Sequence, residues 1–201
     1  MNEPVFIFDD DDPAMRDAYL AARGAFKYFW RELSWERRRI LPALEMAAVK
    51  LPFTDGPESD ERPEFEQMWI ADVVFDGEEL TGQLLNSPNW LTSVQAGDEV
   101  RAPLSQLTDW MMTSGGRACG AFTVNVMRSR MNSRERKQHD QAWGVDFGNP
   151  ANVQVELDYG AQSKRGWLTG LFGGKSAIAD PPADAPNGFR DHPMCANMLE
   201  T

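Results

Sequence analysis

The sequence predicts an α+β protein in which one long N-terminal helix packs on a strongly bent, mostly antiparallel sheet. A single apolar stripe at helical spacing runs through residues 13–33, and short β-rich segments separated by tight turns fill most of residues 44–127. After Gly160 the composition becomes rich in Gly and Pro. We therefore expect one α+β domain over residues 1–160, followed by a loosely structured tail over residues 161–201.

The first helix has both a start signal and an apolar face. Asp12 is a favoured N-cap residue, and Pro13 suits the first helical position because its missing N–H needs no partner there. The apolar residues that follow recur every three or four positions: Met15, Ala18, Tyr19, Ala22, Phe26, Phe29, Trp30 and Leu33. Such a stripe indicates a helix laid on a sheet. Residues 5–8, which precede it, read as a short strand.

Alternating β-forming segments and turns then predict the sheet. The expected strands cover residues 44–53, 68–75, 80–85, a short segment near 100, 104–112, 118–127 and 153–159. Asp76-Gly77 is a strong hairpin signal, and Ser114-Gly115-Gly116 predicts another turn. Asn132 and Glu135 have the spacing of a capping box, which predicts a polar helix that ends near Trp143.

Composition and charge restrict the classes of function. No segment reaches the roughly 20 apolar residues that span a bilayer, and the two cysteines, Cys119 and Cys195, predict free thiols in a cytoplasmic protein. The formal net charge of −11 disfavours nucleic-acid binding and suits a basic protein partner. The simpler interpretation is that the acidic surface only keeps the protein soluble.

Familiar catalytic signatures are missing from the sequence. It has no phosphate-binding Gly-Lys-Ser/Thr loop, no paired-histidine helix and no nucleophile elbow. Glu135 and His139 supply only two metal ligands at helical spacing, and Cys119 with His139 makes at most an incomplete thiol dyad. We expect neither a metal nor another cofactor.

Two kinds of charge cluster are candidate contacts. Acidic residues crowd one predicted loop and its edge: Asp55, Glu58, Asp60, Glu61, Glu64 and Glu66. This loop is a candidate contact for a basic partner, or a solvated loop. Basic residues form one group at Arg31 and residues 37–39 and a second at Arg128, Arg130, Arg134, Arg136 and Lys137. Interleaved acids favour a solvated or ion-paired face over a nucleic-acid site for both groups.

Asp109 beside Trp110 is the strongest candidate for a reactive group. Burial in an aromatic-lined pocket raises the pKa of a carboxyl group, although an aspartate of this kind more often holds a loop or pairs with an arginine. Further pocket candidates lie in the same stretch of sequence: Trp69, Asn86 and Asp98.

The order of short motifs in this stretch resembles the YegJ-like family of bacterial proteins, a domain of unknown function (2314). The motifs are Glu-x-Met-Trp at 66–69, Gly-x-Leu-x-Asn-x-Pro at 82–88, Gly-Asp-x-Val at 97–100, Asp-Trp-Met at 109–111 and Gly-x-Phe-Thr at 120–123. The resemblance covers residues 13–127, including the Val49-Lys50 strand. Residues 135–148 and 192–194 look like an extension found in longer members. The family implies no catalytic residues, and it is only loosely associated with toxin–immunity proteins.

These observations favour a non-enzymatic protein-binding module, of an immunity or regulatory type, that neutralises a basic partner such as a toxin. The alternative is a small hydrolase with a pocket around Asn86, Asp98, Asp109 and Trp110. The sequence does not predict an oligomeric state.

Overall fold

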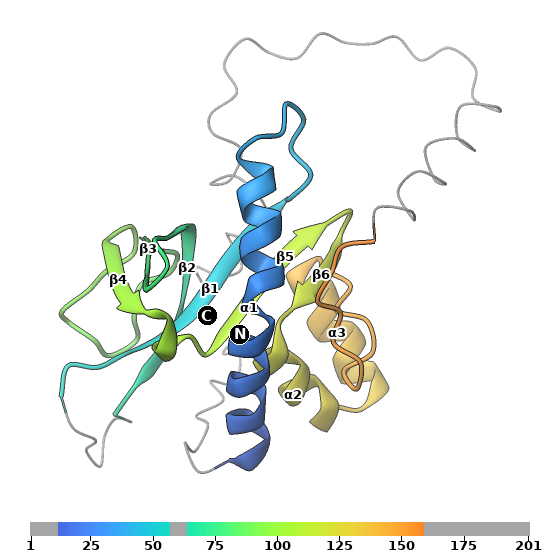
Figure 1. Cartoon of the computed structure of the whole chain (residues 1–201). Coiled ribbons are helices and arrows are strands. Elements are labelled where there is room, and N and C mark those ends of the chain that lie inside the picture. The colour runs from blue at the N-terminus through green and yellow to red at the C-terminus, as the bar shows by residue number, and fades with distance from the viewer. Residues whose placement is uncertain (1–11, 57–63, 159–201) are drawn as a thin grey trace, which may run out of the picture.

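The computed structural model describes residues 12–56 and 64–158 (Figure 1). Its elements, in chain order, are α1 (Pro13–Glu36), β1 (Met46–Phe53), β2 (Glu66–Phe75), β3 (Glu79–Leu84), β4 (Glu99–Pro103), the 3-10 turn η1 (Leu104–Gln106), β5 (Asp109–Ser114), β6 (Arg117–Gly120), α2 (Phe122–Arg130) and α3 (Ser133–Trp143). The α+β class is therefore confirmed. None of the helices in these residues combines the length and the apolarity that a bilayer-spanning segment needs.

Helix α1 begins where the sequence predicts. The Asp12 side chain accepts a hydrogen bond from the backbone N–H of Ala14 at 3.0 Å, and Pro13 takes the first helical position. The apolar stripe lies against the sheet, with Ala22 and Phe29 fully buried. In Figure 1 the helix crosses the front of the central strands. Local capping and the hydrophobic period therefore decide this element.

The six strands form one open sheet in the order β4-β3-β2-β1-β5-β6, and every neighbouring pair is antiparallel. The register of β2 against β3 shifts between Ala71 and Val74, where Asp72 has a positive φ of 53°. A bulge of this kind bends a strand and increases its twist. The expected hairpin at Asp76-Gly77 joins these two strands.

Alternation along the strands divides the core into two clusters. Ala47 and Val49 of β1 pack with α1, whereas Met46 and Ala48 point the other way. The first cluster also holds the buried aromatic residues of α1 and Trp110. The second cluster joins β1, β2 and β5 to the start of α2 and to the segment around Phe147. The central strands are thus buried on both faces.

Three strand predictions are wrong. Residues 104–112 do not form one strand, because η1 precedes β5. The expected strand 118–127 is divided into the short strand β6 and helix α2. Residues 153–158 form no strand, although the carbonyl of Gln154 accepts a hydrogen bond from the N–H of Gly120 at 2.7 Å. The β-branched residues in these segments favoured strands locally, and tertiary contacts overrode that preference.

Helix α3 confirms the capping-box prediction. The Asn132 side chain accepts from the backbone N–H groups of Arg134 and Glu135, and the Glu135 carboxylate accepts from the N–H of Asn132. The helix ends at Trp143, as expected. The strand expected at residues 5–8 and the tail expected at residues 161–201 lie outside the described residues.

Candidate functional site

Four side chains from separate sequence motifs meet on the sheet face opposite α1. Lys50 of β1 lies opposite Trp69 of β2 and opposite Asp109 of β5. Residues that lie opposite each other in neighbouring strands point to the same face, so these three share it. The Lys50 Nζ lies 4.7 Å from the centroid of the Trp69 ring, and it donates a hydrogen bond to the Thr123 hydroxyl at 3.2 Å. We call Lys50, Trp69, Asp109 and Thr123 the Lys50 cluster.

The Asp109 carboxylate is the centre of the Lys50 cluster. It accepts hydrogen bonds from the backbone N–H groups of Trp110 (2.8 Å), Phe122 (2.9 Å) and Thr123 (2.8 Å), and from the Thr123 hydroxyl (2.6 Å). Ala121, at the N-cap of α2, has no side chain that can cap the helix. Asp109 therefore supplies this cap from β5, with its negative charge at the positive end of the helix dipole.

The Thr123 hydroxyl bridges the two charged groups of the cluster: it accepts a hydrogen bond from the Lys50 ammonium and donates one to the Asp109 carboxylate. Burial lowers the pKa of Lys50 and raises the pKa of Asp109, and each shift is partly offset by the opposite charge of the other group. Lys50 is only partly buried, whereas Asp109 is fully buried and Thr123 is 4% exposed. The carboxylate and the hydroxyl are thus shielded from a substrate. Their arrangement is suited to joining β1, β5 and α2.

Gly120 makes the sharp turn from β6 into α2 possible. Its φ is +78°, and an added Cβ would lie 2.3 Å from the backbone oxygen of Trp110. Only glycine fits both the left-handed backbone and the close approach. The turn brings the first N–H groups of α2 to Asp109, so the Gly-x-Phe-Thr motif has a structural reason.

The predicted pocket residues do not gather around one cavity. Trp110 is fully buried on the α1 side, where its indole N–H donates to the carbonyl of Ala22 at 2.9 Å, so it points away from Asp109. Asn86 and Asp98 lie in the segment that joins β3 to β4, and the Asp98 carboxylate accepts from the N–H of Gln95. Among the expected residues, only Trp69 and Asp109 share the Lys50 cluster.

Two of the predicted acidic contacts hold a loop of the protein itself. The Asp55 carboxylate accepts from the N–H and hydroxyl of Thr92 and the N–H of Ser93. Hydrogen bonding with the Ser93 side chain, together with these bonds, lowers the pKa of Asp55 to about 2. Glu66 is 5% exposed, and it accepts from the N–H and the side-chain amide of Asn89. Glu64 is exposed. Glu58, Asp60 and Glu61 lie outside the described residues.

The structure gives no contact between Cys119 and His139. The Cys119 thiol donates to the carbonyl of Glu156, and burial raises its pKa to about 11, which makes it a poor nucleophile. His139 contacts the Asp140 carboxylate at 3.0 Å and stacks on Trp143. Within residues 12–56 and 64–158, no group of three His, Cys, Asp or Glu residues is placed to hold a metal ion.

The basic cluster at the end of α2 is largely used within the protein. Arg128 is 2% exposed, and its guanidinium makes two hydrogen bonds to Asp140, at 2.8 and 2.7 Å, and one to Asn125. Arg130 pairs with Asp12. Arg134 and Lys137 are exposed. Ion pairs therefore account for much of this cluster, which weakens the nucleic-acid alternative.

Two hollows are present elsewhere on the surface. One, of about 780 Å³, lies beside β6 and is lined by residues 114–119, 146–148, 154 and 156–158. The other, of about 350 Å³, lies between the end of α1 and the bulge of β2. Neither is lined by Asn86, Asp98, Asp109 or Trp110, so the hydrolase alternative gains no pocket from them.

Sequence reasoning missed the roles of Lys50 and Thr123. Lys50 is the only cation in the predicted strand 44–53, and a lone cation in an apolar strand indicates a buried or paired charge. Thr123 stood at the end of a motif, but nothing local connected it to an aspartate 14 positions earlier. The Arg128–Asp140 pair had no local signal either.

Comparisons with known proteins identify the family. Residues 12–147 match the model of an uncharacterised protein family conserved in bacteria (DUF2314). The match therefore reaches into the first part of the expected extension, residues 135–148, whereas residues 192–194 lie beyond it. A protein of Neisseria meningitidis serogroup B named "Putative ankyrin repeat protein" is 40% identical over 195 residues, which cover 97% of this chain and 67% of that protein. The uncharacterised protein YegJ of Escherichia coli is 31% identical over 80 residues, which cover 40% of this chain and 48% of that protein. No solved structure matches significantly. The chain belongs to the DUF2314 family, the YegJ-like family that its motifs resemble.

Proposed function

We propose that this chain is a non-enzymatic protein-binding module, of an immunity or regulatory type, that takes a basic protein partner such as a toxin on its acidic surface. The observation that carries the proposal is a division among its carboxylates. Asp109 and Glu66 are buried and bind the backbone of the protein itself. Glu64, in the predicted acidic contact, is exposed, and the net charge is −11. An exposed carboxylate there is available for recognition, and the field of the acidic surface would accelerate the approach of a cationic partner.

The acidic segment 55–66 is anchored at both of its ends. Asp55 binds Thr92 and Ser93, while Glu66 binds Asn89. Both anchors therefore lie on one short stretch, residues 89–93, at the edge of the sheet. This arrangement supports residues 58–64 as the contact.

The Neisseria relative adds an independent argument. Its printed name is that of an ankyrin repeat protein, and ankyrin repeats stack into extended concave binding surfaces. That name describes the relative, which is longer than this chain. A family member with such a name is consistent with a role in protein recognition.

The test is affinity capture with the full chain as bait, from a bacterium that carries its gene. The bait is compared with the variant Glu58→Lys/Glu61→Lys/Glu64→Lys at low and moderate salt. We expect one basic protein that the original chain retains and that the variant retains at least about tenfold less, because reversed charges repel a cation.

A matched control separates this local effect from net charge. The variant Asp17→Lys/Glu78→Lys/Glu99→Lys changes the net charge equally and replaces only exposed acids. It should keep most of the binding. Equal capture by the two variants, or no specific protein in any lane, would overturn the proposal. If the partner is a toxin, co-expression with this chain should restore growth.

A further inference from the structure

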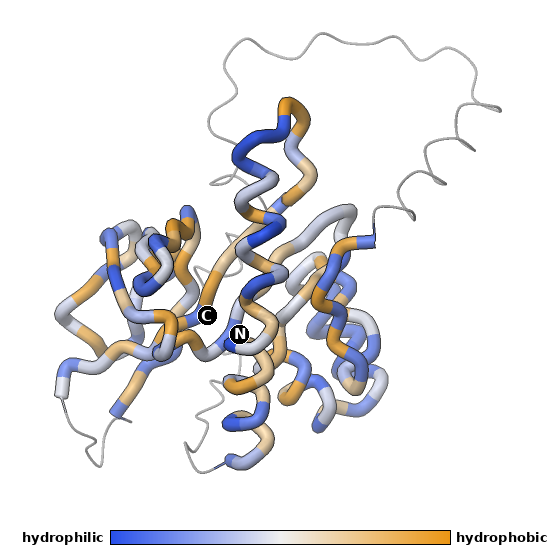
Figure 2. Tube along the Cα trace, viewed as in Figure 1, coloured by the Kyte–Doolittle hydropathy of each residue, from blue (hydrophilic) through white to orange (hydrophobic). Residues whose placement is uncertain are grey.

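The loop between α1 and β1 carries an apolar tip. Ile40 is 97% exposed and Leu41 is 81% exposed. Figure 1 shows this loop projecting beyond the sheet, and Figure 2 shows hydrophobic residues at its tip beside a hydrophilic stretch at the end of α1. Single exposed aliphatic side chains are common, but two adjacent ones at the end of a projection indicate a contact surface.

An apolar hollow lies next to this tip. Its volume is about 350 Å³, and its lining residues are Leu33, Glu36, Arg37, Leu44, Ala47, Asp72 and Val73. The same region of the molecule therefore offers both a projecting apolar group and a recess that suits one.

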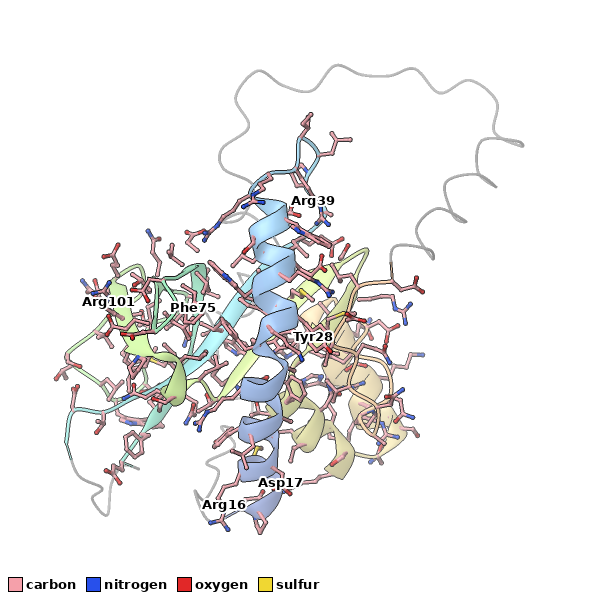
Figure 3. The ribbon with its side chains drawn as sticks, viewed as in Figure 1. Arg16, Asp17, Tyr28, Arg39, Phe75 and Arg101 are labelled. Carbon is pink, nitrogen blue, oxygen red and sulfur yellow. The ribbon has the colours of Figure 1, made fainter. Side chains whose placement is uncertain are left out.

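Charges of both signs flank the tip and the hollow. Arg39 and Glu36 pair with each other at 2.8 Å, and Figure 3 shows Arg39 near the top of α1. Arg38 and Asp72 are both exposed, and among the described residues the structure gives neither a salt bridge. A two-fold interface pairs each feature of one copy with its complement on the other, so a surface that carries both a knob and a hollow suits such an interface.

We propose that this surface is a symmetric dimer interface, in which the Ile40–Leu41 tip of each copy fills the hollow of the other and Arg38 faces the partner's Asp72. A second copy suits this surface because Arg38 and Asp72 give it one exposed charge of each sign, which a two-fold arrangement pairs reciprocally. The interface uses none of the residues in the acidic segment 55–66. Its failure would therefore leave the proposed function untouched.

Sedimentation equilibrium of the full chain, from about 1 to 200 µM, tests the dimer. The original chain should show a reversible monomer–dimer equilibrium. The variant Ile40→Asp/Leu41→Asp should raise the dimer dissociation constant at least about 100-fold, because each copy places a charge in an apolar recess. Leu20→Asp is the matched control, because Leu20 is 64% exposed and lies three positions after Asp17, which Figure 3 labels at the end of α1 opposite the tip. It should leave the dissociation constant unchanged.

A charge swap tests the geometry. Arg38→Asp and Asp72→Arg should each weaken the dimer about tenfold, and the double variant should recover most of that loss. Circular dichroism verifies that every variant is folded. A chain that stays monomeric throughout the range, or a tip variant that dimerises normally, would overturn the proposal. A monomer that instead co-sediments with phosphatidylglycerol vesicles through its tip would assign the surface to lipid and also overturn it.

Discussion

Replacing Asp109 by alanine should strongly destabilise the fold. The substitution removes the acceptor of four hydrogen bonds and leaves the partly buried Lys50 without its opposing charge. Removing one partner of a buried charge pair costs about 3–5 kcal/mol, and an unpaired buried N–H adds about 1–3 kcal/mol where water cannot reach it. We therefore expect the free energy of unfolding to fall by at least about 3 kcal/mol.

Urea denaturation, followed by tryptophan fluorescence, measures this loss. Asp109→Asn should lower the free energy of unfolding by at least about 2 kcal/mol, because the new NH₂ group is itself a donor and would face the donors that the carboxylate now accepts from. Glu99→Ala is the control, since Glu99 is exposed, and it should stay within about 0.5 kcal/mol of the original protein. A loss below about 1 kcal/mol for Asp109→Ala would refute the view that this carboxylate fixes α2.

A double-mutant cycle identifies the role of charge. Lys50→Met removes the cation but keeps an apolar chain against Trp69. If Lys50 destabilises the fold only when Asp109 is missing, the free energy of unfolding of the double variant Lys50→Met/Asp109→Ala should fall by about 1–3 kcal/mol less than the sum of the decreases in the two single variants. Strict additivity would show that the two groups stabilise the fold separately.

Three further predictions concern single residues. Gly120→Ala should lower the free energy of unfolding, measured by urea denaturation, by about 3 kcal/mol or more, because Gly120 has a positive φ and the new Cβ would lie 2.3 Å from a backbone oxygen. Gly24→Ala should raise it by up to about 1 kcal/mol, because an added Cβ there meets open space on a helix. Equal effects would contradict the close approach. In a chain with Cys195 replaced by serine, Cys119 should react with iodoacetamide at pH 8 about 200-fold more slowly when the protein is native than when it is unfolded. The reason is that burial raises the pKa of the Cys119 thiol to about 11. Equal rates would show that the thiol is accessible and ionises normally in the native protein. Asp55 has its pKa lowered to about 2, so its stabilisation is complete above its unfolded pKa near 4 and is lost as pH falls towards 2. Asp55→Asn should therefore flatten the decrease of unfolding free energy between pH 4 and 2, and an unchanged slope would contradict this assignment.

The sequence also argues against a pocket shared by Asp109 and Trp110. Asp109 and Trp110 are neighbours in a strand, and neighbouring strand residues point to opposite faces. A pocket containing both side chains was therefore unfavourable from the start. The structure places Trp110 under α1 and Asp109 in the Lys50 cluster.

The sequence by itself determined the elements whose signals are local. Asp12-Pro13 begins α1, Asn132 and Glu135 cap α3, and Asp76-Gly77 turns between β2 and β3. Each depends on groups within a few positions of one another, where chain connectivity already keeps them close. The ordered family motifs likewise sufficed to identify the family.

Only the tertiary structure decided where α2 begins and what Lys50 does. Residues 118–127 have the composition of a strand, but the carboxylate that caps α2 comes from Asp109, and Lys50 reaches the same network from another strand. Contacts across 14 and 73 positions leave no periodic signal in the sequence. They form only when antiparallel pairing of β1 with β5 brings the groups together, which is why local propensity failed at this point.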